Sequence, residues 1–89
     1  MVTRLATVKN EYGLHCRPSS VIAREAMSYS GTIMVRSPSG QANAKSVLEM
    51  VSLAAGCGEQ VTILVKGPDE EAVAQRFVGL FETHFDFEK

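Results

Sequence analysis

The sequence predicts an α+β fold, an open-faced β-sandwich in which three helices lie on one face of a four-stranded, mostly antiparallel sheet. Two observations predict it. Short runs of apolar and β-branched residues alternate with runs of helical periodicity, and the resulting order is β-α-β-β-α-β-α, with no internal repeat and no linker. The chain also has 89 residues, of which 45% are hydrophobic, which is enough for one modest core. We therefore expect residues 1–89 to form a single domain.

The first strand and the first helix lie on either side of a polar turn. Residues 3–9 alternate in the manner of a strand, and residues 10–13, NEYG, form the turn. Over residues 16–29 the apolar side chains recur at helical spacing. Pro18 belongs in the first turn of this helix, where a backbone N–H has no intrahelical acceptor to lose. The Ser-Gly pair at 30–31 ends the helix.

The remaining elements come in short succession. Residues 32–36 and 41–44 predict two strands joined by the turn SPSG. Residues 47–55 predict a short helix that ends at the following glycines. Residues 60–66, QVTILVK, form the strongest strand pattern in the chain, and residues 70–85 predict a final helix with an apolar stripe. Short strands separated by helices favour an antiparallel sheet with the helices packed on one face.

The charge balance argues against two classes of function. The formal net charge is −1, from nine Lys and Arg and ten Asp and Glu, and no segment concentrates the basic residues. We therefore expect no nucleic-acid partner. No apolar run approaches the ~20 residues of a membrane span, and the alternating N-terminus lacks the apolar block of a signal peptide. These features predict a cytoplasmic protein without membrane insertion.

The two cysteines, Cys16 and Cys57, are far apart and belong to no C-x-x-C motif. Without a secretion signal we expect free thiols, with a single disulfide bridge as the alternative. We expect no metal site and no cofactor. The acidic run at 69–71 is predicted to favour the N-terminus of the last helix, and His84 is predicted to pack on that helix or to interact with its C-terminal dipole.

His15 stands at a chemically distinct position, in the stretch NEYGLHCRPSSVIAREA. It directly precedes the first predicted helix, whose unpaired N–H groups and partial positive charge favour an anion. The amides of Cys16 and Arg17 and the Arg17 guanidinium suit phosphate oxygens, and Gly13 allows a sharp turn that presents the ring outward. The same helix end disfavours imidazolium, so the neutral, nucleophilic ring is favoured. These residues predict a reversible phosphoryl acceptor; an ordinary surface histidine at a helix start is the alternative.

The segment GLHCRPSS resembles the active-site segment of the HPr family, the histidine phosphocarriers of the bacterial phosphotransferase system, where it usually reads G-L-H-A-R-P-A. The stretch AKSVLEMVSLAAGCGEQVTILVKGPDEEA is similar to the family's K-S-I-M-x-x-M-x-L stretch and to the strand and acidic helix start behind it. The resemblance covers nearly the whole chain. It implies a relay component rather than a self-sufficient enzyme. Such a protein accepts a phosphoryl group from phosphohistidine on enzyme I and passes it to a histidine on enzyme IIA domains.

Carried onto this sequence, the resemblance makes His15 the phosphoryl acceptor, through its Nδ1. It makes Arg17 the charged partner of the phosphate, with the backbone amides of Cys16 and Arg17 capping the phosphate oxygens. Transfer between two imidazoles is a near-balanced in-line displacement in which positioning and charge neutralisation dominate. The step needs no metal on this domain, and we expect the protein to be a monomer.

Ser46 opens an S-x-x-E capping box, SVLE, in which Ser46 Oγ is expected to accept the Glu49 N–H while Glu49 reaches back to the Ser46 N–H. The resemblance adds a regulatory role, because many HPr proteins are phosphorylated at the matching serine by HPr kinase/phosphorylase. Glu49 departs from the family, which usually has glycine there, and its carboxylate is expected to repel a phosphate on Ser46. The capping role and the regulatory role are compatible.

The docking residues and Cys16 each have two interpretations. Val47, Leu48 and Val51 match the family's docking surface for enzyme I and enzyme IIA, and the alternative is that they belong to the core. Cys16 replaces the usual alanine, either as a small side chain that fits or as an acidified thiol whose oxidation blocks phosphotransfer. Glu11 brings a negative charge close to the expected phosphate.

Two further functional readings compete with the phosphocarrier. The first is a regulatory HPr-like protein that signals through Ser46 or through a nitrogen-type branch and is not dedicated to sugar transport. The second is a hydrolase with Cys16 as nucleophile and His15 as base, which is disfavoured because adjacent residues at a helix start do not face each other and no third orienting group is evident.

Overall fold

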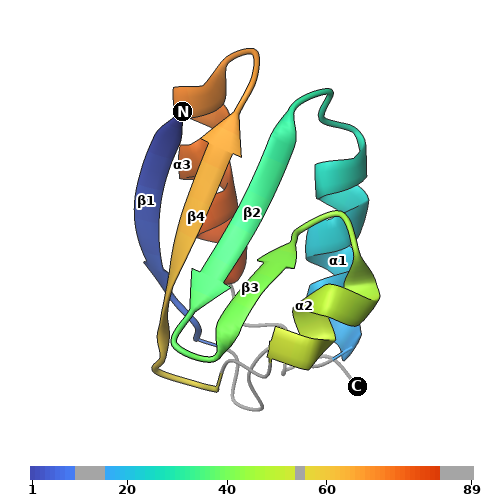
Figure 1. The fold of residues 1–89 in the computed structure, drawn as a ribbon, viewed down its shortest axis with the longest axis vertical. Coiled ribbons are helices and arrows are strands. Elements are labelled where there is room, and N and C mark those ends of the chain that lie inside the picture. The colour runs from blue at the N-terminus through green and yellow to red at the C-terminus, as the bar shows by residue number, and fades with distance from the viewer. Residues whose placement is uncertain (10–15, 54–55, 83–89) are drawn as a thin grey trace.

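The computed structural model describes residues 1–9, 16–53 and 56–82, and confirms the predicted class and element order. In chain order the elements are β1 (Val2–Thr7), α1 (Cys16–Met27), β2 (Thr32–Ser37), β3 (Gly40–Asn43), α2 (Val47–Leu53), β4 (Gln60–Lys66) and α3 (Glu70–Phe81). The four strands form one sheet in the order β1-β4-β2-β3 (Figure 1). All three strand pairings are antiparallel, whereas the sequence predicted a mostly antiparallel sheet.

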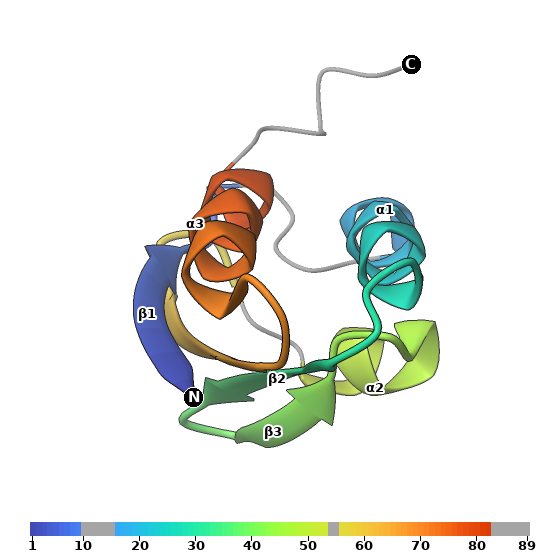
Figure 2. The same ribbon diagram turned by 90° about the horizontal axis from the view of Figure 1, so that it is seen from above.

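The three helices cover one face of the sheet, as predicted (Figure 2). α3 packs on β1 and β4, while α2 packs against β3 and α1. α1 also contacts α3, so that the two long helices lie side by side above the strands. Within the described part of the chain, no helix has both the length and the apolar character that crossing a lipid bilayer demands.

β4 shows why these residues form a strand at this place. Its residues alternate strictly, and Val61, Ile63 and Val65 point at the helices and are buried. The register pairs Ile63 with Arg4 on one side and with Val35 on the other, which places β4 between two neighbours. A strand in this position is protected on both edges and on one face, and its predicted bounds, 60–66, are those observed.

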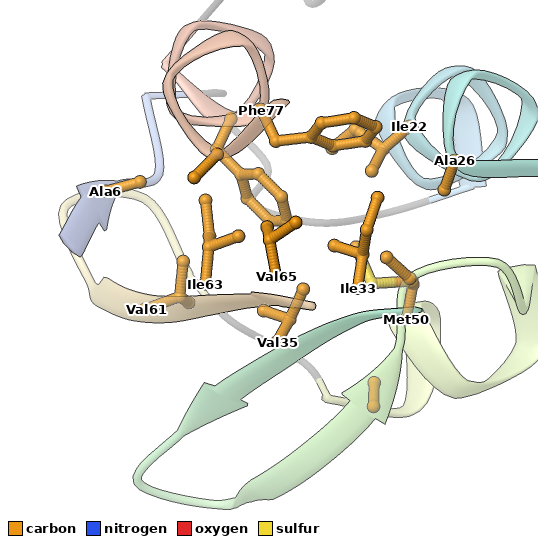
Figure 3. Packing of buried hydrophobic residues seen from close by; sticks show 14 of the residues in the cluster. Ala6, Ile22, Ala26, Ile33, Val35, Met50, Val61, Ile63, Val65 and Phe77 are labelled. Atoms are coloured by element: carbon orange, nitrogen blue, oxygen red, sulfur yellow. The ribbon is translucent and has the colours of Figure 1, made fainter. Parts of the chain in front are cut away.

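The core lies between the sheet and the helices (Figure 3). Phe77 of α3 and Ile22 of α1 lie next to each other above the strand residues, and Ile22 faces Ile33 of β2. The largest fully buried side chains are Phe77, Phe81, Ile22, Ile33, Met50 and Ile63. Full burial of a side chain of this size contributes about 1.5–3 kcal/mol, so this layer is the main stabilising element of a small domain.

Several element ends differ from the sequence expectation. β2 ends at Ser37 instead of 36, β3 spans Gly40–Asn43 instead of 41–44, and α2 ends at Leu53, with the rest of its expected range, 54–55, outside the described residues. α1 ends at Met27 instead of 29, because Ser28 N and Tyr29 N donate to carbonyls only three residues back, at 3.4 and 3.0 Å, which tightens the last turn. β1 spans Val2–Thr7, and Val8 beyond it still pairs through its N–H with Glu59 O at 2.9 Å. α3 ends at Phe81; the predicted continuation to residue 85 and His84 lie outside the described residues.

Both edge strands have a backbone N–H covered by a carboxylate. Thr7 N in β1 donates to Glu82 Oε2 at 3.0 Å, and Asn43 N in β3 donates to Glu49 Oε1 at 2.8 Å. Each glutamate belongs to a helix or to its C-cap and reaches across to the edge of the sheet. Unpaired edge amides are a template for an incoming strand, and these two are occupied within the chain.

Tyr29, just after the end of α1, joins three segments of the chain. Its hydroxyl donates to Pro68 O at 2.7 Å, and its carbonyl accepts a hydrogen bond from Lys45 Nζ at 2.8 Å. Gly67 makes room for the ring, since it has a φ of 146° and a Cβ there would lie 2.6 Å from the Tyr29 hydroxyl. The end of α1 is thereby fixed to the loops before α2 and α3.

Candidate functional site

The start of α1 is the first component of the site. The helix begins at Cys16, so His15 occupies the position directly before it in the sequence; His15 itself lies outside the described residues. The first-turn amides of Cys16 and Arg17 have no intrahelical carbonyl partner, and Pro18 has no N–H to offer. No acidic residue lies in this first turn. An anion at this end of the helix therefore meets backbone donors and no carboxylate of the same turn.

α1 is held in place by a buried stripe. Ser19, Ile22, Ala23 and Ala26 are buried, whereas Met27 is 67% exposed. The buried residues recur at helical spacing and pack the helix against the core. Of the apolar residues whose spacing predicted this helix, Ile22 and Ala26 are buried, whereas Val21 is half-buried. A helix anchored along its length presents its first turn in a fixed direction, and a group carried there gains from this rigidity.

Ser46 caps α2, which confirms half of the predicted capping box. Ser46 Oγ accepts the Glu49 N–H at 3.2 Å, and Ser46 O accepts the Met50 N–H at 3.0 Å. The other half of the prediction is wrong, because the Glu49 carboxylate accepts from Asn43 N rather than from Ser46 N. The Ser46 N–H already donates to Asn43 O at 2.9 Å in the preceding turn, so Glu49 binds the next available amide.

The turn before α2 is tightly organised around Asn43. Its side-chain Oδ1 accepts the Lys45 N–H at 2.9 Å, while its backbone N and O bind Glu49 and Ser46. The Lys45 ammonium is directed to Tyr29 O and does not neutralise the Glu49 carboxylate. A phosphate on Ser46 would therefore enter a rigid turn with a negative charge one helical turn away. Asn43 was not predicted as part of this turn, although Asn is a common turn residue because its side chain can bond the backbone two residues on.

The predicted docking residues of α2 differ in how far they are exposed to solvent. Leu48 is 81% exposed, Val47 and Val51 are half-buried, and Met50 and Leu53 fill the core on the opposite side. Leu48 therefore does not belong to the core, and the two valines belong to it only in part. These three residues lie on the helix that packs against α1, and they form an apolar surface next to it.

The remaining predicted positions carry no site in the described residues. Cys57 is exposed with a free thiol, and only the backbone of Cys16 is described, so the redox hypothesis stays a prediction. No group of three or more metal-ligating side chains occurs among the described residues. Glu11 and His84 both lie outside them.

The acidic start of α3 has a structural role. Glu70 Oε1 lies 2.7 Å from the N-terminal ammonium of Met1, and Glu70 Oε2 accepts the Gly67 N–H at 3.0 Å. The hydrogen bond to the ammonium, followed by that to Gly67, lowers the pKa of this carboxyl from its ordinary value. Asp69 makes no side-chain cap and adopts a left-handed φ of 51°. Beside its expected interaction with the helix dipole, Glu70 thus forms an ion pair with Met1, the residue directly before β1.

The comparisons with known proteins first define the class. Residues 2–83 match the family model described as the PTS HPr component phosphorylation site. The phosphocarrier protein HPr of Treponema pallidum is 35% identical over 88 residues, which covers 99% of this chain and 100% of that protein. The HPr-like protein Crh of Halalkalibacterium halodurans is 30% identical over 82 residues, 92% of this chain and 98% of that protein.

A solved structure agrees with the sequence relatives. The HPr of Thermoanaerobacter tengcongensis superposes with a TM-score of 0.84 at 33% identity and covers 92% of each chain. The chain belongs to the HPr family of phosphocarrier proteins of the phosphotransferase system. It is a relay component without catalytic activity of its own, and its partners are components of that system.

Proposed function

We propose that this protein carries a phosphoryl group on Nδ1 of His15, between enzyme I and enzyme IIA domains, with residues 1–89 acting as one cytoplasmic domain. The observation that carries the proposal is the start of α1 at Cys16, directly after His15, with no acidic residue in the first turn. The amides of Cys16 and Arg17 and the guanidinium of Arg17 then bind the phosphate oxygens.

The chemistry is an in-line transfer between two imidazoles. The lone pair on Nδ1 of neutral His15 attacks the phosphorus of the phosphohistidine on enzyme I, a new N–P bond forms, and the old N–P bond breaks as its electron pair returns to the enzyme I imidazole. The reverse geometry applies when an enzyme IIA histidine attacks the phosphoryl group on His15. No cofactor takes part, and the contribution of this chain is positioning and charge neutralisation.

The apolar surface of Val47, Leu48 and Val51 supports transient docking of both partners. Leu48 is exposed and its neighbours are half-buried, which gives a small apolar patch on a helix that packs against α1. A carrier must release each partner after transfer, and a patch of this size suits a weak, short-lived complex better than a permanent one.

Ser46 is the proposed regulatory position, with HPr kinase/phosphorylase as the enzyme that modifies it. Its hydroxyl caps α2 and lies beside the proposed docking residues Val47 and Leu48, so a phosphate there alters the charge of the docking surface. Glu49 opposes the modification, because its carboxylate is fixed nearby on Asn43 N. We propose that phosphorylation occurs but is slower than it is without this charge.

A regulatory HPr-like protein is the second candidate function. The observation that favours it is the 30% identity to the HPr-like protein Crh, which lies close to the 35% identity to the phosphocarrier HPr. Such a protein would act through Ser46 or through a nitrogen-type branch. Transfer from His15 to a sugar-specific enzyme IIA domain separates the two functions, because the regulatory protein is not dedicated to sugar transport.

The first experiment measures phosphate incorporation from phosphoenolpyruvate with purified enzyme I, in the wild type and in His15→Ala. Acid-labile phosphate on the wild type alone is the expected result, followed by transfer to an enzyme IIA domain. Arg17→Gln is expected to slow both steps and to leave the urea midpoint unchanged. Labelling of the His15→Ala variant, or a folded wild type that the cognate enzyme I does not label, would overturn the proposal.

A further inference from the structure

The face of the sheet that points away from the helices is not covered by any described segment (Figure 2). Strand alternation places Leu5, Leu64 and Met34 on this outer face. Leu64 lies between Thr3 and Met34 in one row of the register, and Leu5 stands in the next row. Leu5 is 61% exposed, although it belongs to a strand whose alternate residues are buried.

All charged residues of the four strands are basic. The strands contain no Asp or Glu, and their three charged residues are Arg4, Arg36 and Lys66. Arg36 and Lys66 are exposed and alternate onto the outer face. Lys66, at the end of β4, also interacts electrostatically with Glu70 at the start of α3, so Arg36 is the main cationic group of this face. The outer face is therefore cationic, although the chain has a net charge of −1.

A shallow hollow of about 370 Å³ brings the apolar and the cationic groups together. Its lining consists of Leu5, Arg36, Ser37, Pro38, Gln60 and Thr62. Leu5 opposes Thr62 in the register, and Thr62 opposes Arg36, so the three side chains form one row across β1, β4 and β2. Among the described residues, no carboxylate forms an ion pair with Arg36.

We propose that this outer face binds an acidic segment of a partner protein, with an apolar side chain of the partner against Leu5 and a carboxylate on the Arg36 guanidinium. Arginine pairs with carboxylates through two parallel N–H···O bonds, which fixes orientation as well as affinity. The exposed leucine supplies the apolar contact beside that charge, an arrangement found at protein interfaces.

The charges and the residue types of the outer face favour an acidic protein segment over a second copy of the chain, a nucleic acid or a membrane. A second copy that used the same face would bring the basic residues of both copies, Arg36 and Lys66, into one interface without acidic residues from the strands to pair with them. Single-stranded nucleic acid binds sheets through stacking on aromatic rings, and none of the four strands contains an aromatic residue. Attraction to an anionic membrane takes clusters of about 4–8 basic residues, more than this face presents.

The proposed surface is independent of the phosphoryl relay. It points away from α1 and α2, the helices that carry the proposed phosphoryl and docking sites. A partner bound to the outer face therefore leaves those sites accessible, and the outer face and the docking residues can be occupied at the same time. Substitutions on the outer face are therefore expected to change binding there and to leave phosphorylation by enzyme I unchanged.

The test is a titration of the ¹⁵N-labelled full chain with the peptide acetyl-EDLFDE-amide, followed by NMR chemical shifts. We expect saturable shifts centred on the amides of Leu5, Arg36 and Thr62. Arg36→Glu is expected to weaken binding at least about tenfold, which is about 1.4 kcal/mol, and Arg36→Gln to weaken it less. The matched control is Arg24→Glu, which reverses an exposed arginine on α1 and is expected to have no effect.

Four outcomes would overturn the proposal. The first is that the neutral analogue acetyl-QNLFNQ-amide binds equally well, and the second is that the shifts lie on α1 and α2. The third is that Arg24→Glu loses as much affinity as Arg36→Glu, and the fourth is that no saturable shift occurs. Sedimentation of the protein with phosphatidylserine vesicles, or a dimer that forms with rising concentration and is lost in Leu5→Ser, would instead assign the face to a membrane or to a second copy.

Discussion

Glu49 holds the backbone of Asn43: its Oε1 accepts the Asn43 N–H at 2.8 Å, while its own N–H donates to Ser46 Oγ at 3.2 Å. One residue of α2 thus fixes the adjacent edge strand and completes the cap of its own helix. Its charge and its hydrogen bond have separate consequences, because a carboxamide oxygen can accept the same N–H without the charge.

Glu49→Gln and Glu49→Ala separate these two roles. Glutamine keeps an acceptor for Asn43 N, so we expect its free energy of unfolding to stay near that of the wild type, whereas alanine is expected to lose about 0.5–1.5 kcal/mol. Both variants remove the negative charge beside Ser46, and both are expected to be phosphorylated faster by HPr kinase/phosphorylase. Urea unfolding and initial phosphorylation rates measure the two effects. Equal rates in all three proteins would show that the carboxylate does not oppose the kinase.

Ser46→Ala removes the cap of α2 and is expected to destabilise the domain by about 1 kcal/mol. Ser46→Asp restores an acceptor for the Glu49 N–H, so its urea midpoint should return most of the way to the wild-type value. Its added charge beside the docking residues should still slow transfer from enzyme I. If Ser46→Ala were as stable as the wild type, the hydrogen bond to Glu49 N would have no role in stability.

Stability in acid is expected to depend on Glu70. Contacts with the Met1 ammonium and with Gly67 N lower its pKa in the folded protein, so its contribution is present above the ordinary carboxyl pKa and is lost as the pH falls through the lowered one. The difference in urea midpoint between the wild type and Glu70→Gln should be largest near neutral pH and should shrink between about pH 5 and pH 3. Glu71→Gln, at an exposed position in the same turn, is the control. A difference that is constant with pH would contradict this role.

Alkaline pH is expected to act through Tyr29. Partial burial, and then the negative charges of Glu70 and Asp69, raise the pKa of this hydroxyl. A raised folded pKa means that the stabilisation is present below the ordinary tyrosine pKa of about 10 and is lost as the pH rises through the folded value. Tyr29→Phe, which also loses the bond to Pro68 O, should therefore lie below the wild type at neutral pH and converge with it in alkali. Comparing the phenolate absorbance of the two proteins checks the titration, since Tyr12 is the other tyrosine.

Ile63 tests the central strand. It is fully buried in β4, between Arg4 and Val35 in the register. Ile63→Val removes one methyl group and is expected to reduce the free energy of unfolding by about 0.5–1.5 kcal/mol, and Ile63→Ala by about 2–5 kcal/mol. The matched control is Leu64→Val on the outer face, where a smaller loss is expected because the side chain is only half-buried. Equal losses at both positions would contradict the one-sided core.

The fold was predictable where local pattern and burial agree. β4 alternates strictly because one of its faces is buried, so its bounds could be read from the sequence. The start of α1 was predictable because Pro18 and the apolar spacing mark the same boundary. The end of α1 was not, because the tightening of its last turn coincides with the contacts of Tyr29 to Lys45 and Pro68, residues far along the chain.

At the candidate site, the structure tests the predicted capping box, of which one half is confirmed and the other is wrong. A capping box is a local pattern, and the Ser46 Oγ to Glu49 N bond follows from it. The pattern does not include Asn43, whose carbonyl takes the Ser46 N–H and whose N–H takes the Glu49 carboxylate. The bond between Thr7 N and Glu82 joins residues 75 positions apart, and no local signal marks it.

The carboxylates on Thr7 N and Asn43 N also bear on how the protein behaves in a crowded solution. When two copies of the chain meet edge to edge, the outward-pointing amides of β1 and β3 are the groups with which a further strand would pair. An approaching strand has to displace a charged group before it can pair with either of these two amides. Two glutamates with no part in phosphate chemistry thus help the sheet to stay four strands wide, and chance encounters end in separation rather than in fibre growth.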